Sequence, residues 1–264
     1  MTALILVTND DGVRSPGLHA LAAAMLPLGE VLIAAPASQQ TSMSRALLRG
    51  GEAGRIEQHP LMLDGRALTA YGIHGSPALA AAHGVLELAD RVPDLCVSGI
   101  NYGENLGLSL TRSGTLGAAL ELTSFGIPGI AVSLESRPED HYATDYPPMD
   151  WATAAWIAHE LAARVLARGL PSGTHILNIN VPHGATRATP LRWTHQSRHN
   201  YYEYIDQHER PHDQPYRLRE DRITRADVEP TSDIYAFAVE RAIAITPLTA
   251  NLTAPGYADA WLTP

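Results

Sequence analysis

Residues 3–12 read ALILVTNDDG, an apolar run that ends in two neighbouring carboxylates. This pattern is typical of a buried strand in an α/β protein, followed by the turn at its carboxyl end where such proteins bind ligands. The turn can bring Asp10 and Asp11 toward one point. Unless one takes up a proton, two close carboxylates in a partly dry site favour a hard divalent cation. The alternative is an Asx turn that caps the next helix, which Asn9 or Asp11 could supply alone.

Strands and helices alternate beyond this turn. Further buried strands are expected at 31–35, 94–98, 129–134 and 175–181, and helices from Pro16 onward and at 78–89, 113–125 and 151–168. Residues 45–72 are expected to form a hairpin-like excursion, and residues 135–149 a mobile surface loop. The alternation predicts an α/β fold with a parallel, doubly wound sheet and right-handed crossovers.

The character of the chain changes near residue 184, after which charged and aromatic residues dominate to about residue 230. We expect protruding strands here that pair with another subunit, then a late strand at 242–247 and a short helix near 257–262. The sequence therefore predicts a main domain at 1–184 and a C-terminal hairpin-and-tail region at 185–264, with one strand returning to the main domain. The scattered histidines of this region are expected to be solvated or interfacial rather than metal-bound: His195, His199, His208 and His212.

The composition excludes several classes of protein. A net charge of −9 without a basic cluster argues against a nucleic-acid partner. No apolar stretch approaches the ~20 residues that span a bilayer, so we expect a soluble, cytoplasmic protein with no membrane partner. All 19 basic residues are arginine, which excludes Walker-type phosphate loops, kinases and Schiff-base enzymes, because each needs a lysine. Cys96 lies in an apolar run and is expected to be buried and inert.

Three polar loops should meet at one edge of the predicted sheet, because parallel strands end on the same side. They cover residues 8–15, 36–44 and 99–115. Carboxylate, amide and hydroxyl oxygens suit Mg²⁺, Mn²⁺ or Ca²⁺ better than zinc, which favours histidine and cysteine. The candidate metal ligands from these loops are Asp10, Asp11, Thr41 and Asn101.

A helix that begins at Ser113-Gly114-Thr115 offers a second feature of the same cleft. Its first N–H groups lack partners and its N-terminus carries partial positive charge, so an anion such as phosphate can bind there. Ordinary capping by Ser113 is the alternative for this tripeptide alone. A divalent ion beside such an anion site would stabilise charge on a phosphoryl group, which predicts phosphomonoester hydrolysis.

Taken together, these segments resemble the SurE family of stationary-phase survival proteins. The matching pieces are ILVTNDDGVRSPGL at 5–18, AAPASQQTSMS at 34–44, GSPALAAAHGV at 75–85, PDLCVSGINYGENLG at 93–107 and SGTLGAALE at 113–121. The resemblance implies a Rossmann-like domain whose smaller C-terminal part is exchanged between subunits of a homodimer or homotetramer. It also implies metal-dependent hydrolysis of nucleoside 5'- and 3'-monophosphates and, in some members, of short-chain polyphosphate.

The resemblance also assigns roles to residues of the cleft. Asp10 and Asp11 match the paired metal acids of the family, and Asn101 matches its asparagine ligand. Thr41 stands where the family usually has serine, so the hydroxyl is kept and a methyl group is added. One divalent ion per subunit is implied, Mg²⁺ or Mn²⁺ first. Asp10 and Asp11 are also the candidate catalytic residues, and whether water or one of them attacks phosphorus stays open.

The phosphate and substrate side of the cleft involves a second group of residues. Asn105 and the run Ser113-Gly114-Thr115 match the phosphate-holding region of the family, and Asn9 is added as a neighbour of the acids. A function of another class remains open, namely a non-catalytic module that binds a nucleotide or metal and signals through the exchanged C-terminal arm.

Overall fold

The structure is a computed structural model that describes residues 2–204, 211–213, 220–222 and 227–253. The strands are β1 (Ala3–Thr8), β2 (Gly29–Pro36), β3 (Ile56–Leu63), β4 (Arg66–Ile73), β5 (Leu95–Tyr102), β6 (Gly129–Leu134), β7 (Ile176–Val181), β8 (Leu191–Trp193), β9 (Tyr202–Tyr204), β10 (Glu220–Arg222) and β11 (Ile243–Leu248). The α-helices are α1 (Pro16–Met25), α2 (Pro77–His83), α3 (Gly114–Leu122) and α4 (Ala152–Arg168).

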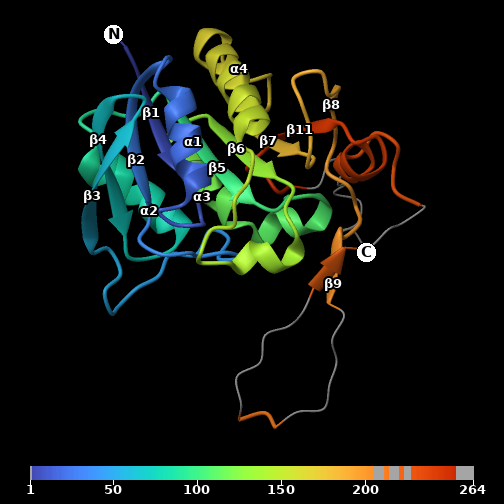
Figure 1. Cartoon of the computed structure of the whole chain (residues 1–264), viewed down its shortest axis with the longest axis horizontal. Helices are drawn as coiled ribbons and strands as arrows, with labels where there is room; N and C mark the ends of the chain where they lie inside the picture. Colours follow the sequence, from blue (N-terminus) through green and yellow to red (C-terminus); the bar gives the residue numbers. More distant parts are fainter. Residues whose placement is uncertain (1, 205–210, 214–219, 223–226, 254–264) are drawn as a thin grey trace, which may run out of the picture.

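A mostly parallel sheet forms the centre of the molecule, which confirms the predicted α/β class (Figure 1). Over the described residues it has nine strands in the order β3-β4-β2-β1-β5-β6-β7-β11-β8. Strand β1 pairs in parallel with β2 on one side and β5 on the other. The order of strands reverses at β1, and in doubly wound sheets the crevice at such a point is the usual ligand site.

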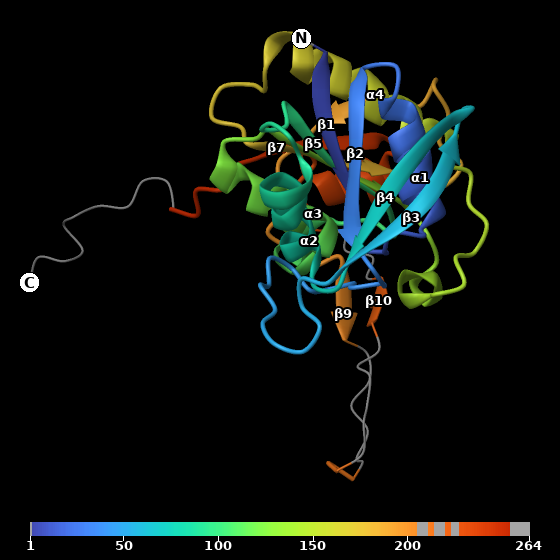
Figure 2. The same ribbon diagram turned by 90° about the vertical axis from the view of Figure 1, so that its left-hand side faces the viewer.

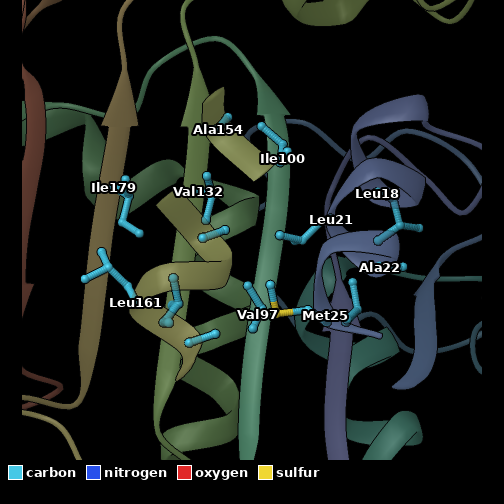
Figure 3. Close-up of a cluster of buried hydrophobic side chains, with 14 of the residues drawn as sticks. Leu18, Leu21, Ala22, Met25, Val97, Ile100, Val132, Ala154, Leu161 and Ile179 are labelled. Atoms are coloured by element: carbon cyan, nitrogen blue, oxygen red, sulfur yellow. The ribbon is translucent and has the colours of Figure 1, made fainter. Parts of the chain in front are cut away.

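Helices cover both faces of the sheet, as a doubly wound fold requires. Helices α1 and α4 pack on one face, where Leu21, Met25 and Leu161 contact a cluster that includes Val97 and Val132 (Figure 3). Helices α2 and α3 bury mainly alanine and leucine side chains on the other face. The core is aliphatic, and Cys96 is buried within it with its pKa raised to about 12 by desolvation, consistent with an inert thiol.

Both edges of the sheet contain antiparallel strands. Strands β3 and β4 form the hairpin expected within residues 45–72. At the other edge, β11 runs antiparallel to β7 and parallel to β8, so a late strand does return to the main sheet. The division of the chain at residue 184 stays a prediction. The expected helix near 257–262 lies outside the described residues.

Three predicted elements differ from the structure. Strand β5 continues to Tyr102 instead of ending at Ser98, with a register shift between Ser98 and Asn101. Gly99 permits this, because its φ is +132° and a Cβ there would lie 2.2 Å from the Val132 carbonyl oxygen. The helices expected at 78–89 and 113–125 stop being α-helical at His83 and Leu122 and finish in π and 3₁₀ turns.

Residues 135–149, expected as a mobile surface loop, pack against the end of the sheet. They contain the 3₁₀ helix η4 (Pro138–Tyr142), and the Tyr146 hydroxyl donates to the Asp11 carbonyl oxygen at 3.1 Å. Asp140 is buried, with both carboxylate oxygens accepting hydrogen bonds from Arg137. This segment therefore forms part of the wall around the predicted site.

Strands β9 and β10 form a two-stranded antiparallel arm that projects from the body below the carboxyl ends of β1 and β2 (Figure 2). Protruding strands were expected in this part of the chain. Their pairing with another subunit stays a prediction, and His208 lies outside the described residues. No helix among the described residues is both long enough and apolar enough to cross a bilayer.

Candidate active site

The three polar loops meet at the carboxyl ends of β1, β2 and β5. They line a small hollow of about 60 Å³, room for several water molecules or a phosphate group. Five of the predicted site residues contribute to its lining: Asp10, Thr41, Asn101, Asn105 and Ser113. The topology thus brings together the residues that are far apart in the sequence.

Asp10 lies between the sheet and the N-terminus of α3. The Thr115 hydroxyl donates to its Oδ1 at 2.6 Å. Gly114 allows this close approach, because a Cβ at that position would lie 2.7 Å from the Asp10 side chain. Burial raises the pKa of Asp10 to about 6, although hydrogen bonds from the Thr115 side chain and from the backbone of Thr115 and Gly114 lower it. The first turn of α3 therefore holds a metal-ligand candidate in place.

Asp11 is buried next to Asp10 and has an incomplete set of partners. Its Oδ2 accepts a hydrogen bond from the Tyr102 backbone N–H at 3.2 Å. Its Oδ1 is buried without a hydrogen-bond partner among the described residues. Burial and the charge of Asp10 raise the pKa of Asp11 well above its ordinary value. A buried carboxylate beside a second acid in this way favours the binding of a cation, which would stabilise the ionised form of both.

The other two predicted ligands complete a set of oxygen donors. The Asn101 side chain donates through Nδ2 to the Gly103 carbonyl at 2.6 Å, which turns its Oδ1 away from that partner. This Oδ1 is also buried without a partner among the described residues. The Thr41 hydroxyl donates to the His141 carbonyl at 3.2 Å and keeps its lone pairs for another contact.

This donor set fits a hard divalent cation. Unpaired oxygens of Asp11 and Asn101, the Asp10 carboxylate and the Thr41 hydroxyl are the ligand types that Mg²⁺ and Mn²⁺ prefer. Within the described ranges, no group of three or more His, Cys, Asp or Glu side chains is placed to hold a metal ion. His195 and His199 accordingly belong to no such group in the described part of the chain.

The predicted phosphate-side residues occupy different positions. Asn9 folds back on its own turn, where its side chain donates to the Gly12 carbonyl and accepts from the Gly12 N–H, both at 3.1 Å. Asn105 lines the hollow, and its Nδ2 donates to the Ser133 hydroxyl at 2.9 Å. Ser113 caps α3, since its Oγ accepts from the Leu116 N–H at 3.1 Å. Ser113 therefore caps α3 and also lines the hollow.

Further residues line the hollow that the sequence patterns did not single out: Glu104, Arg112, His141, Tyr202 and Glu220. The last two belong to the arm, more than 100 positions after the acids. His141 comes from η4, and burial together with the charge of Arg222 lowers its pKa to about 4, so the imidazole is neutral at pH 7. Of these five residues, only Glu104 could have been suggested by the sequence, because it lies within the NYGENLG loop.

A buried ion pair between Arg222 and Glu104 connects the arm to the NYGENLG loop. The Glu104 side chain is fully buried, and its Oε1 accepts hydrogen bonds from Arg222 Nε at 2.7 Å and from the Tyr202 hydroxyl at 2.5 Å. Burial raises the pKa of Glu104, and the Arg222 guanidinium opposes that rise. Arg222 also donates to the Ser136 carbonyl, which joins the arm to the segment after β6.

Residues 5–203 match the protein family described as Survival protein SurE. The chain belongs to the SurE family. A 5'-nucleotidase SurE from Methanocella arvoryzae is 41% identical over 257 residues, which cover 96% of this chain and 94% of the relative. A 5'-nucleotidase SurE from Thermococcus gammatolerans is 38% identical, covering 95% of this chain and 91% of the relative.

A solved structure supports the SurE fold for 95% of the chain. The crystal structure of a SurE protein from Aquifex aeolicus superposes with a TM-score of 0.73 at 27% identity, covering 95% of this chain and 94% of that one. The sequence resemblance to the SurE family and the Rossmann-like architecture are therefore both confirmed.

Proposed function

We propose that this SurE-family chain is a divalent-metal-dependent phosphomonoester hydrolase that acts on nucleoside 5'-monophosphates. The observation that carries the proposal is the buried pair Asp10 and Asp11 beside the unpaired Oδ1 of Asn101. Burial raises the pKa of both acids, and the charge of Asp10 raises the pKa of Asp11 further. The names of the relatives, 5'-nucleotidase SurE, supply the nucleotide as substrate. Activity on 3'-monophosphates and on short-chain polyphosphate belongs to the same proposal.

The residues of the chain have distinct roles in this reaction. Asp10, Asp11, Thr41 and Asn101 would hold one Mg²⁺ or Mn²⁺ ion per subunit. When bound, the ion would draw negative charge from the phosphoryl oxygens and so stabilise the transition state. Thr115 orients Asp10 through the 2.6 Å hydrogen bond.

The phosphate group lies between this ligand set and the start of α3. Asn105 and Ser113, which line the hollow, and Gly114 at the start of the helix would contact it there, and the helix N-terminus would favour its negative charge. We assign the attack on phosphorus to a water molecule, because both aspartates would serve as ligands of the ion. Asn9 acts indirectly, since its two hydrogen bonds to Gly12 hold the shape of the turn that carries the acids.

Phosphate release tests the proposal directly. Protein stripped with EDTA should release no phosphate from adenosine 5'-monophosphate, and added Mn²⁺ or Mg²⁺ should restore release in the wild type. Asp10→Asn should lower the rate at least 100-fold while the chain still folds, because the change removes a ligand and no core contact. If calorimetry detects nucleotide binding but no phosphate appears over hours, the chain is a binding module and the proposal fails.

The assembly and location of the protein complete the proposal. We propose a homodimer or homotetramer in which the region 185–264 is exchanged between subunits of a cytoplasmic enzyme. Light scattering on the full chain should give a mass that is a multiple of the 28.4 kDa subunit. A monomeric mass at all concentrations would exclude the exchange.

A further inference from the structure

Strand β7 buries two asparagines on the face of the sheet that α3 covers. Its sequence, ILNINV, alternates, so that Leu177 and Ile179 join the apolar cluster on the opposite face. Asn178 and Asn180 between and after them are completely buried. A buried amide without partners costs free energy, so the contacts of these two side chains need an explanation.

Both asparagines contact the same residue, Asn105 of the loop that follows β5. The Asn105 backbone N–H donates to Asn180 Oδ1 at 2.7 Å. The Asn105 carbonyl accepts from Asn178 Nδ2 and from Asn180 Nδ2, both at 3.0 Å. Side chains of β7 therefore satisfy both backbone polar groups of Asn105, which itself lies outside helices and strands.

A third buried side chain fixes the amide of Asn105. Asn105 Nδ2 donates to the Ser133 hydroxyl at 2.9 Å, and Ser133 of β6 pairs in register with Asn180. A side-chain amide nitrogen carries two N–H groups. Within the described part of the chain, Ser133 takes one of them, and the second remains for a group in the hollow that Asn105 lines.

The unmet acceptor of Asn178 indicates a role beyond packing. Its Oδ1 is buried without a hydrogen-bond partner among the described residues, and its Nδ2 donates to a carbonyl that Asn180 also serves. A buried unpaired acceptor destabilises the fold. An aliphatic side chain would avoid this cost, and aliphatic residues fill the neighbouring positions of the strand. Stability alone therefore does not account for an amide at this position.

We infer that Asn178 and Asn180 are positioning residues of the phosphate subsite, which hold Asn105 so that its second side-chain N–H contacts the phosphoryl group. The inference rests on the proposed function and adds β7 to the strands that build the site. Asn105 is the residue that touches the substrate, and the two asparagines act through it. A donor that is fixed before binding loses little entropy and stays aligned, so a loosened Asn105 should bind phosphate more weakly.

Binding of inorganic phosphate to the Mg²⁺-loaded full chain, measured by calorimetry, tests the inference without turnover. Asn180→Leu keeps the branching at Cγ but carries no amide, so it removes two of the three hydrogen bonds to the Asn105 backbone. We expect phosphate affinity to fall about tenfold, while the affinity for Mg²⁺ stays within about threefold of the wild type. The kcat/KM for adenosine 5'-monophosphate should fall at least as far as phosphate affinity.

A double-mutant cycle separates positioning from a general loss of structure. In an Asn105→Ala background the phosphate contact is already gone, so adding Asn180→Leu should change phosphate affinity by less than about twofold. Its effect on the free energy of unfolding should persist, because the lost bonds go to the Asn105 backbone. Additive losses of phosphate affinity would show that Asn180 does not act through Asn105 and would overturn the inference.

Thr246→Val is the matched control. Thr246 of β11 is fully buried, pairs in register with Asn178, and shares a 2.8 Å hydrogen bond with the Thr194 hydroxyl. The change removes a buried hydrogen bond of the same sheet that does not involve Asn105, so phosphate affinity should stay at the wild-type value. A fall equal to that of Asn180→Leu would overturn the inference, because it would indicate a general effect of this part of the sheet.

Asn178→Leu serves as the second variant if Asn180→Leu does not fold. It removes one donor to Asn105 together with the unpaired Oδ1, so its free energy of unfolding should match or exceed that of the wild type, while phosphate affinity falls at least about threefold. Unchanged phosphate affinity in this variant, or no phosphate binding by the wild type, would overturn the inference. If the wild type releases no phosphate from adenosine 5'-monophosphate, the proposed function fails instead, and phosphate binding still decides the role of β7.

Discussion

At the scale of single residues, the site depends on two neighbouring acids that are held together in a buried position. Asp10 and Asp11 are both fully buried, and burial is the main cause of their raised pKa values. The fold keeps them together because the turn is fixed by Asn9 and Gly12 and because Thr115 holds Asp10. The arrangement is thus destabilising without a cation and stabilising with one.

The first prediction concerns the pH dependence of metal-free stability. Folding raises the pKa of Asp10 from 3.8 to about 6, so between these values the native state binds more protons than the unfolded chain. The free energy of unfolding of EDTA-treated protein should therefore fall as the pH rises through this window, by about 3 kcal/mol from Asp10 alone, and the raised pKa of Asp11 adds a change of the same sign. Urea unfolding at several pH values measures it.

Asp10→Asn is the reference for that series, because it cannot titrate. The difference in unfolding free energy between wild type and variant should shift against the wild type from pH 4 to pH 6. A difference that stays constant over this range would show that Asp10 ionises in the folded chain as it does in the unfolded one.

The second prediction concerns Thr115. Thr115→Val keeps the shape of the side chain but removes the hydrogen bond to Asp10 Oδ1. Loss of a hydrogen bond to a charged group costs roughly 1.5–3 kcal/mol, so the Mn²⁺ concentration for half-maximal activity should rise roughly tenfold or more. Thr115→Ser keeps the hydroxyl and should stay near the wild type. Equal behaviour of both variants would exclude a role for the hydroxyl.

At the scale of elements, the arm of β9 and β10 depends on the buried pair of Glu104 and Arg222. Arg222→Met should leave the Glu104 carboxylate buried without its cation and lower the free energy of unfolding by about 3–5 kcal/mol. Adding Glu104→Gln should recover much of that loss, because the orphaned charge is removed. Urea unfolding of the four members of this double-mutant cycle gives the coupling energy.

A small effect of Arg222→Met would carry a different meaning. A loss below about 1 kcal/mol would show that water reaches Glu104 once the guanidinium is gone, so that the arm separates readily from the loop. The buried contact would then not be what holds the arm.

At the scale of the whole molecule, binding of a cation should raise the stability of the folded chain. A ligand at 100 times its Kd stabilises the native state by about 2.7 kcal/mol, which shifts the Tm of a protein of this size by several degrees. Mn²⁺ or Mg²⁺ should therefore raise the Tm of EDTA-treated wild type and have little effect on Asp10→Asn. An equal shift in both would place the binding elsewhere.

The architecture of the whole molecule could be predicted in large part from the sequence alone. The buried strands, the hairpin at 45–72 and the meeting of Asp10, Thr41 and Asn101 follow from periodicity and from parallel strands ending on one side. The continuation of β5 to Tyr102 depends on a backbone conformation at Gly99 that no local pattern reports. The contribution of the arm was missed because it depends on contacts across more than 100 residues.

The position of the arm in the chain has a consequence for biosynthesis. During translation, the turn that contains Asp10 and Asp11 is made first. Tyr202 and Glu220, which line the same hollow as Asp10, are made only near the end. Strand β7 likewise waits for β11 before its free edge is paired. Each nascent polypeptide therefore passes through a period in which the edge of β7 and the two carboxylates are uncovered, and a chain that stops before Tyr202 would lack both β11 and the arm.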